Sequence, residues 1–355
     1  MTELVVGTKK GLFVLEGDGP DAFEITTRAF AGEQVECGIR DTRSGRIFAA
    51  VNNAFYGPKL WYADDPAGEW TQADGPGLPE GGDDALVKIW VIVPGERDGQ
   101  LYLGGDPGVL FESEDSGASW HLNEGLWQEP SRPRWQPGGG GLCLHSIVPW
   151  PGDPDRVAVA VSAAGVWLTD DGGRSWRQGV EGIVAPYLPE DVEDASMSLC
   201  IHRLERAPKR PERMFLQFHG GVYRSDDAGG SWTAIGAGLP SDFGFPIALD
   251  PADPDSAYVI PLQGDFDRVT PEGHVRVYET RDAGASWAPR GSGLPENGAY
   301  LTVLRRAFDR AGEGETLQLY FGATSGDVFG TRDAGGSWFT AATRLPPVYS
   351  VTASV

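Results

Sequence analysis

Short apolar segments separated by turns recur along the whole chain. In the stretch 144–176, a Pro-Gly-Asp-Pro turn and then an Ala-Ala-Gly turn separate three apolar runs, and the third run leads to a tryptophan. Apolar runs of this length, bounded by Gly, Pro and Asp, are typical of β-strands. The 50 glycines and 27 prolines are mixed with aromatic residues throughout. The pattern predicts an all-β protein made of many short strands.

An eight-residue motif, Ser/Thr-x-Asp-x-Gly-x-Ser-Trp, marks the end of the third strand in each repeated unit. Five complete copies occupy residues 113–120, 169–176, 225–232, 280–287 and 331–338, and degenerate copies occupy 16–23 and 63–70. Their final aromatic residues are 47 to 56 positions apart, which is the period of a four-stranded propeller blade. In such a turn the Asp accepts backbone N–H groups, the Gly takes positive φ, and the Trp packs between blades.

The two ends of the chain predict how the ring closes. The N-terminal segment supplies three strands, at Leu4–Val6, Leu12–Leu15 and Phe23–Thr26, whereas Pro347–Ser354 has room for one. Pairing these four strands would complete a seventh blade and leave no open sheet edge. We therefore expect one domain, residues 1–355, folded as a seven-bladed β-propeller closed by a C-terminal strand, in preference to a ring of six or eight blades.

Composition narrows the classes of partner. The formal charge of -22 disfavours nucleic acid, because an acidic surface repels phosphates. No apolar run approaches the ~18 residues of a membrane span, and the N-terminus has no signal-peptide pattern. The three cysteines are odd in number and far apart, so they do not indicate a disulfide framework. We expect a cytoplasmic protein with no nucleic-acid and no membrane partner.

The repeats resemble those of the Asp-box, or BNR-repeat, propellers and cover nearly the whole chain. That family includes sialidases, xyloglucan-cleaving glycoside hydrolases, sortilin-type receptors and photosystem-assembly propellers, so the resemblance implies a fold and no single function. Four segments further resemble bacterial single-domain propellers described as sialidase-like or glycosyl-hydrolase-like: GGGGLCLHSIVPWP, LCIHRLERAP, FLQFHGGVYRSDDAGGSW and GLPSDFGFP. Sialidase activity itself is not expected, because the chain lacks the Arg-Ile-Pro signature and predicts seven blades instead of six.

Histidines are predicted to gather at one mouth of the ring. In a propeller the first strand of each blade lines the central channel. His145 and His202 start the first strands of neighbouring blades, and His219 ends the second strand of the His202 blade. We predict one divalent transition metal, zinc or similar, on His145, His202 and His219, with a thiolate or carboxylate completing the shell. Cys143 and Cys200, each two residues before a histidine, are the candidate thiolates; the alternative is that they are small buried side chains of the core. The alternative for the three histidines is a hydrogen-bonded polar ring with a structural role.

Acidic, aromatic and basic residues are expected at the same mouth. Asp106 occupies the same position in its blade as His219 does in the His202 blade. These two residues are the candidate acid/base groups. The alternative for Asp106 is an ordinary solvated carboxylate. Aromatic rings at the channel rim can stack on the faces of sugars, or they can pack against a loop, and the sequence favours neither interpretation. The candidate ligand-binding residues are Trp90 and Tyr300, both aligned with His145, Arg134 in the loop before His145, and His274 in a long insertion.

Three functional hypotheses follow from this arrangement. The first is a hydrolase- or lyase-type enzyme that acts on a small-molecule or glycan-type ligand at the histidine-lined mouth, with or without a metal. The second is a non-catalytic scaffold or assembly factor that binds a protein partner. The third is a ligand-binding module without turnover. A deep polar pocket with coupled histidine titrations favours the enzyme, and a shallow apolar patch of more than a few hundred Å² favours the scaffold.

Overall fold

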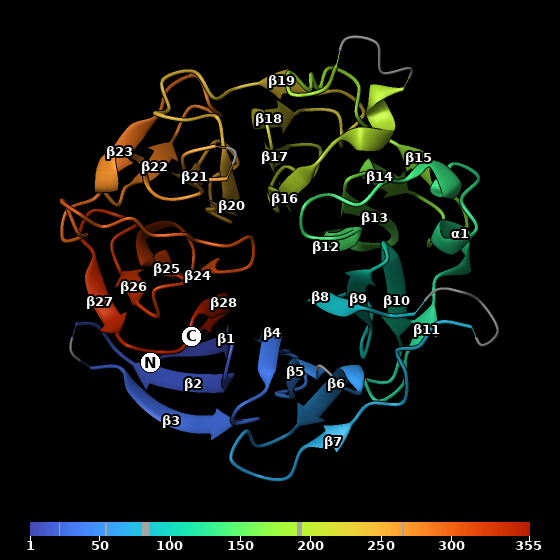
Figure 1. The fold of residues 1–355 in the computed structure, drawn as a ribbon, viewed down its shortest axis with the longest axis horizontal. Helices are drawn as coiled ribbons and strands as arrows, with labels where there is room; N and C mark the ends of the chain where they lie inside the picture. Colours follow the sequence, from blue (N-terminus) through green and yellow to red (C-terminus); the bar gives the residue numbers. More distant parts are fainter. Residues whose placement is uncertain (21, 54, 80–84, 190–193, 265) are drawn as a thin grey trace.

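β-Strands dominate the structure, as the alternation of apolar segments and turns predicts. A computed structural model describes residues 1–355 apart from 21, 54, 80–84, 190–193 and 265. Within the described residues, 28 strands form seven four-stranded antiparallel sheets around a common axis (Figure 1). The seven-bladed β-propeller expected from the repeats is therefore confirmed.

Each sheet runs from an innermost strand near the axis to an outermost strand at the perimeter (Figure 1). From the inside outward, the seven blades consist of β28 (Val348–Ser354), β1 (Thr2–Thr8), β2 (Gly11–Gly17) and β3 (Glu24–Ala29); β4 (Gln34–Arg40), β5 (Ile47–Asn53), β6 (Gly57–Ala63) and β7 (Thr71–Gln72); β8 (Lys88–Pro94), β9 (Leu101–Asp106), β10 (Val109–Ser113) and β11 (His121–Leu122); β12 (Cys143–Trp150), β13 (Asp153–Ser162), β14 (Gly165–Thr169) and β15 (Arg177–Gln178); β16 (Ile201–Arg206), β17 (Met214–Phe218), β18 (Gly221–Ser225) and β19 (Thr233–Ala234); β20 (Gly244–Leu249), β21 (Ala257–Pro261), β22 (Val277–Thr280) and β23 (Ala288–Arg290); and β24 (Phe308–Ala311), β25 (Gln318–Gly322), β26 (Val328–Thr331) and β27 (Phe339–Ala342).

Short helices occupy some of the connections. In the described residues these are α1 (Glu124–Trp127) and the 3-10 turns η1 (Arg132–Arg134), η2 (Ala195–Ser198), η3 (Pro271–Gly273) and η4 (Gly314–Thr316). None of the described helices has the length and apolarity needed to cross a membrane.

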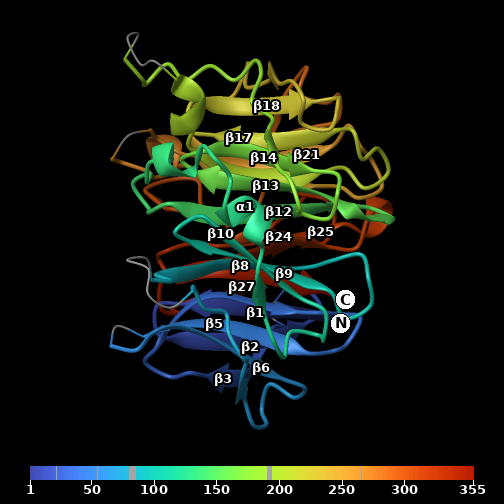
Figure 2. The same cartoon turned by 90° about the vertical axis from the view of Figure 1, so that its right-hand side faces the viewer.

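The C-terminal strand closes the ring. β28 pairs antiparallel with β1, with Leu4 opposite Ala353 and Val6 opposite Val351. The chain termini therefore lie side by side (Figure 2). Val351 is buried in a core cluster that joins this blade to the one before it. The predicted closure, with one C-terminal and three N-terminal strands in a single sheet, is confirmed.

The repeated motif forms a hydrogen-bonded turn between the third and fourth strands. In the copy at 225–232, the Asp227 carboxylate accepts the Ser231 N–H at 2.8 Å and the hydroxyls of Ser231 and Ser225, each at 2.7 Å. Burial opposes ionisation of Asp227, but these hydrogen bonds outweigh it and lower its pKa. The same contacts recur in the other four complete copies. Residue 21 of the copy at 16–23 lies outside the described residues.

Tryptophans of the motif connect neighbouring blades. The Trp232 indole N–H donates to the Gly179 carbonyl at 3.0 Å, and the Trp287 indole N–H donates to the Ile235 carbonyl at 2.7 Å. Each acceptor follows the fourth strand of the preceding blade. Trp232 also belongs to a buried apolar cluster formed by both blades, and burial of a large side chain of this kind contributes about 1.5–3 kcal/mol. The core of the protein therefore lies between blades.

Candidate functional site

A β-bulge recurs in the innermost strands and determines which side chains reach the channel mouth. In β12 the pairing with β13 skips His145, and in β16 the pairing with β17 skips His202. A bulge inserts one extra residue and redirects its side chain. In the described innermost strands the unpaired residues are Glu36, Trp90, His145, His202, Phe245 and Tyr349. Pro246, next to Phe245, is unpaired as well.

Three potential metal ligands come together at the end of β16 and β17. The ligand atoms of Cys200, His202 and His219 all lie within 4.8 Å of one another. The backbone brings them together, because the His219 N–H donates to the Cys200 carbonyl at 3.1 Å. Two imidazoles and one thiolate are ligands that zinc favours, and three protein ligands are typical of sites that keep a position open.

His202 is held in the form that a metal requires. Its Nδ1 lies 2.6 Å from the Gly244 carbonyl oxygen, which can only accept, so Nδ1 carries the proton and Nε2 has the lone pair of a neutral ring. Burial, with help from the positive charge of Arg305, holds the His202 pKa well below its usual value. A backbone carbonyl that fixes the second ring nitrogen is a common partner of metal-binding histidines.

The surroundings of the cluster are partly apolar and partly polar. The Cys200 Sγ lies 2.9 Å from the Ser162 Oγ, which is positioned to donate to a thiolate. The His219 ring packs edge-on against His202 at 5.5 Å, with Tyr187 at 4.6 Å and Phe243 at 5.1 Å between ring centroids. These rings make one side of the cluster apolar.

His145 lies in the same rim but outside this cluster. Its Nε2 is 2.8 Å from the Ile201 carbonyl oxygen, and its Nδ1 is 3.0 Å from the Ser146 hydroxyl. That hydroxyl in turn accepts the Leu204 N–H at 3.1 Å. Both ring nitrogens of the fully buried His145 are therefore used to join β12 to β16, and the structure groups Cys200, instead of His145, with His202 and His219.

A cavity opens beside the cluster. It has a volume of about 330 Å³, and His219 and Tyr187 form part of its wall. Phe243, Ser241 and Asp242 line it as well, so one exposed carboxylate shares the cavity with a potential metal ligand. The volume is near the lower end of the range for small-molecule sites.

Asp106 anchors the glycine loop that crosses the mouth. The Leu142 N–H reaches its carboxylate, and a Cβ added to Gly141 would lie only 2.0 Å from its Oδ2. Burial raises the Asp106 pKa, although Lys88 and the Leu142 N–H oppose this. Cys143, in the same region, has its pKa raised to about 12, chiefly by burial, so it remains a thiol at neutral pH.

The other residues predicted to bind ligand are distributed differently. Trp90 lies in a second cavity of about 210 Å³. Tyr300 is 64% exposed and lies against Gly273, in the segment before β24. His274 is half-buried in the insertion between β21 and β22, and Arg134 pairs with Asp194 at 2.9 Å on the exposed surface.

Basic residues that the sequence did not single out reach the mouth instead. Arg268, from the insertion between β21 and β22, places its guanidinium 5.7 Å from the Phe245 ring centroid, and Arg305 lies 4.9 Å from the same centroid. Arg305 and Arg306 precede β24, in the blade where Tyr300 was expected to reach the mouth. The signal available in the sequence was the Arg-Arg pair directly before an innermost strand.

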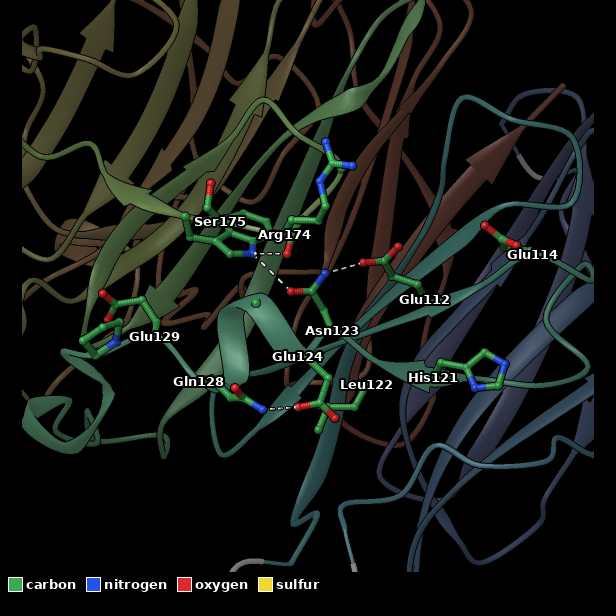
Figure 3. Close-up of a pocket in the computed structure, with 15 residues that line it drawn as sticks. Glu112, Glu114, His121, Leu122, Asn123, Glu124, Gln128, Glu129, Arg174 and Ser175 are labelled. Atoms are coloured by element: carbon green, nitrogen blue, oxygen red, sulfur yellow. Dashed lines mark hydrogen bonds between the residues drawn. The ribbon is translucent and has the colours of Figure 1, made fainter.

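A larger cavity of about 750 Å³ lies elsewhere, between α1 and the motif turn at 172–176 (Figure 3). Three of its polar side chains bond to one another: Glu112 accepts from Asn123 at 2.5 Å, and the Trp176 indole N–H donates to Asn123 at 3.1 Å. Burial raises the Glu112 pKa, and the Asn123 hydrogen bond opposes this. These side chains hold neighbouring blades together, so size alone does not make this cavity the site.

Comparison with known proteins supports the fold and leaves the function open. No protein-family model matches the sequence, and no curated protein is similar to it. The solved structure of an ancestral GH74 enzyme has a TM-score of 0.60 and 17% identity, over 87% of this chain and 38% of that one. This chain therefore spans less than half the length of that enzyme. At this identity the likeness shows the propeller fold alone.

Two further solved structures are less similar. A GH74 xyloglucanase from Xanthomonas campestris has a TM-score of 0.44 and 13% identity, over 95% of this chain and 56% of that one. YCF48 from Cyanidioschyzon merolae has a TM-score of 0.39 and 12% identity, over 71% of this chain and 84% of that one.

Proposed function

We propose that the protein is a metal-dependent enzyme of the hydrolase or lyase type, with a site for one divalent transition metal on Cys200, His202 and His219. The observation that carries the proposal is the convergence of these three ligand atoms within 4.8 Å. We further propose that the chain is a divergent Asp-box propeller, which the recurring turns support. We propose a small-molecule or glycan-type substrate. The two cavities at the channel mouth have volumes of about 210 and 330 Å³, which favours the small molecule.

Each ligand has a defined role in holding the metal. His202 offers Nε2 because the Gly244 carbonyl occupies its other nitrogen. Cys200 would bind as the thiolate, stabilised by the Ser162 hydroxyl. A divalent metal on three protein ligands lowers the pKa of a bound water towards 7 or polarises a substrate oxygen.

Two carboxylates near the site have different proposed roles. Asp242 shares the 330 Å³ cavity with His219 and is exposed, so it can exchange protons with a bound substrate. Asp106 is a positioning residue, because its carboxylate is engaged by the glycine loop at 141–142. Asp242→Asn should lower kcat with little change in metal affinity, whereas loss of metal would place Asp242 in the metal shell.

The first test is cobalt binding to metal-free protein. A tetrahedral cobalt(II) site with a thiolate ligand gives intense visible bands and a near-ultraviolet charge-transfer band. Changes next to metal ligands typically weaken affinity ~10–100-fold, so His202→Ala and Cys200→Ser should weaken binding by more than about 100-fold. Cys200→Ser should also abolish the charge-transfer band. Cys143→Ser and His121→Asn are the matched controls and should keep both affinity and spectrum.

Metal content of protein purified without an affinity tag completes the test. Near-stoichiometric zinc or a similar metal, lost in the Cys200 and His202 variants, would support the enzyme and justify a screen of hydrolysis and lyase substrates. No metal in the wild type, even after reconstitution with zinc or cobalt, would overturn the proposal. The scaffold hypothesis, with a protein partner, would then take its place.

A further inference from the structure

The cavity beside Trp90 has an unusual balance of charge. It has a volume of about 210 Å³ and lies between β4, β8, β28 and the segment before β24. Three cationic side chains, Lys88, Arg305 and Arg306, line it together with a single carboxylate, Glu36. The whole chain has a formal charge of -22, so this concentration of positive charge runs against the general composition.

Three residues that line the cavity each have a buried N–H group without an acceptor. Among the described residues, the Trp90 Nε1, Arg305 Nε and Arg306 Nε are buried without a hydrogen-bond partner. All three belong to residues that line this one cavity, and all three are N–H donors. Buried donors cost free energy when they are not paired, and together with the three cationic side chains they make these residues suited to an anion that accepts hydrogen bonds.

The aromatic rings fix the position of Arg305. Its guanidinium carbon lies 4.9 Å from the Phe245 centroid and 5.8 Å from the Trp90 centroid. Phe245 also contacts His202, with 4.8 Å between ring centroids. The Arg305 guanidinium is therefore separated from His202 by a single aromatic ring.

From this geometry we propose that the cavity is a subsite for the carboxylate of a small organic acid. This inference rests on the proposed function, because it names the class of substrate that the proposed enzyme would bind at the channel mouth. Arg305 is the principal binding residue, and Trp90 and Arg306 donate to the same anion. Glu36, which accepts from Lys88 at 3.2 Å, offsets part of the positive charge and so favours a carboxylate group, with one negative charge, over a phosphate group with two.

A substitution in the glycine loop can place a carboxylate of the protein itself in the subsite. A Cβ added to Gly140 would lie 3.9 Å from the Arg305 Nη1 and 3.9 Å from the Trp90 ring, which is ordinary contact. Gly140→Asp should therefore place a carboxylate next to Arg305 and compete with a bound acid. Gly140→Asn has nearly the same shape without the charge and is the matched control.

The experiment is calorimetric titration of metal-free protein with malonate, and separately with acetate and inorganic phosphate, at constant ionic strength. Wild type should bind malonate saturably. Arg305→Gln and Gly140→Asp should each weaken binding by on the order of 10-fold or more, because charge-assisted hydrogen bonds are lost or already occupied. Arg97→Gln, which removes the same charge from an exposed pair with Asp155, and Gly140→Asn should bind like wild type.

Each outcome decides one point. The absence of saturable binding, or an equal loss in Arg97→Gln, would overturn the subsite. Tighter binding of phosphate than of malonate and acetate would overturn the carboxylate assignment. Because the titration uses metal-free protein, a failure of cobalt to bind would sink the proposed enzyme while leaving this result intact, and the reverse also holds. If Arg305→Gln does not fold, Gly140→Asp on the exposed loop still tests the subsite.

Discussion

The two buried histidines of the rim, His145 and His202, should make the protein sensitive to mild acid. Burial, assisted by Arg305, holds both pKa values well below the ordinary 6.5. Below pH 6.5 the unfolded chain therefore binds protons that the folded protein does not. Stability is fully present above the unfolded pKa and is lost as the pH falls from 6.5 towards the folded values.

The size of the effect follows from proton linkage. With an unfolded pKa of 6.5, lowering the pH from 7.5 to 5.5 costs about 1.4 kcal/mol for each histidine that stays neutral, or about 2.8 kcal/mol for both. This is a large share of a typical stability of 5–15 kcal/mol. Metal on His202 would hold that ring neutral as well, so the measurement belongs on chelator-treated protein.

Urea unfolding at pH 7.5, 6.5 and 5.5, followed by tryptophan fluorescence, measures the loss directly. His145→Gln keeps a donor near the Ile201 carbonyl but does not titrate, so about 1.4 kcal/mol of the pH dependence should disappear. The exposed His121→Gln should leave the pH dependence unchanged. An unfolding free energy that is flat from pH 7.5 to 5.5, or a His145→Gln variant with the full wild-type dependence, would refute the reasoning.

Three other predictions concern the ring itself and are checked by urea unfolding of each variant. Asp227→Ala removes the three acceptor contacts of one motif turn and should cost about 1–2 kcal/mol; a change below 0.5 kcal/mol would contradict the role given to the turn. Gly293→Ala should cost at least about 1 kcal/mol more than Gly238→Ala, because both have positive φ but only the former would place a Cβ 2.1 Å from a backbone oxygen; equal costs would show that the contact relaxes. Val351→Ala in the closing strand should cost about 2 kcal/mol and Val355→Ala almost nothing; equal effects would contradict closure by β28.

The fold was predictable because its signals are local. Each complete motif encodes its own turn through contacts such as those of Asp227 with Ser231, which are four residues apart. The spacing of the turns then sets the number of blades, and the unequal numbers of strands at the two ends set the closure. None of these steps requires knowledge of side-chain packing between distant segments.

The site was predictable only in part, because it depends on contacts between blades. The sequence predicts that His202 and His219 lie at one rim of the channel, and the structure places both next to Cys200. It could not show that the Ile201 carbonyl, 56 residues away in the chain, would occupy the Nε2 of His145. Nor could alignment show that the segment before β24 would deliver Arg305, because that segment pairs with the long insertion through the Thr270 N–H and the Leu301 carbonyl.

The bulges explain how one scaffold can carry unrelated side chains at its mouth. In a regular strand a substitution on the inward face must fit the core between blades. A bulged residue has no partner in the ladder, so its side chain is released from that constraint. Glu36, Trp90, His202 and Phe245 differ in charge, size and chemistry, yet they occupy equivalent bulges in four blades. The side chains at the mouth can therefore change one blade at a time without altering the turns that build the ring.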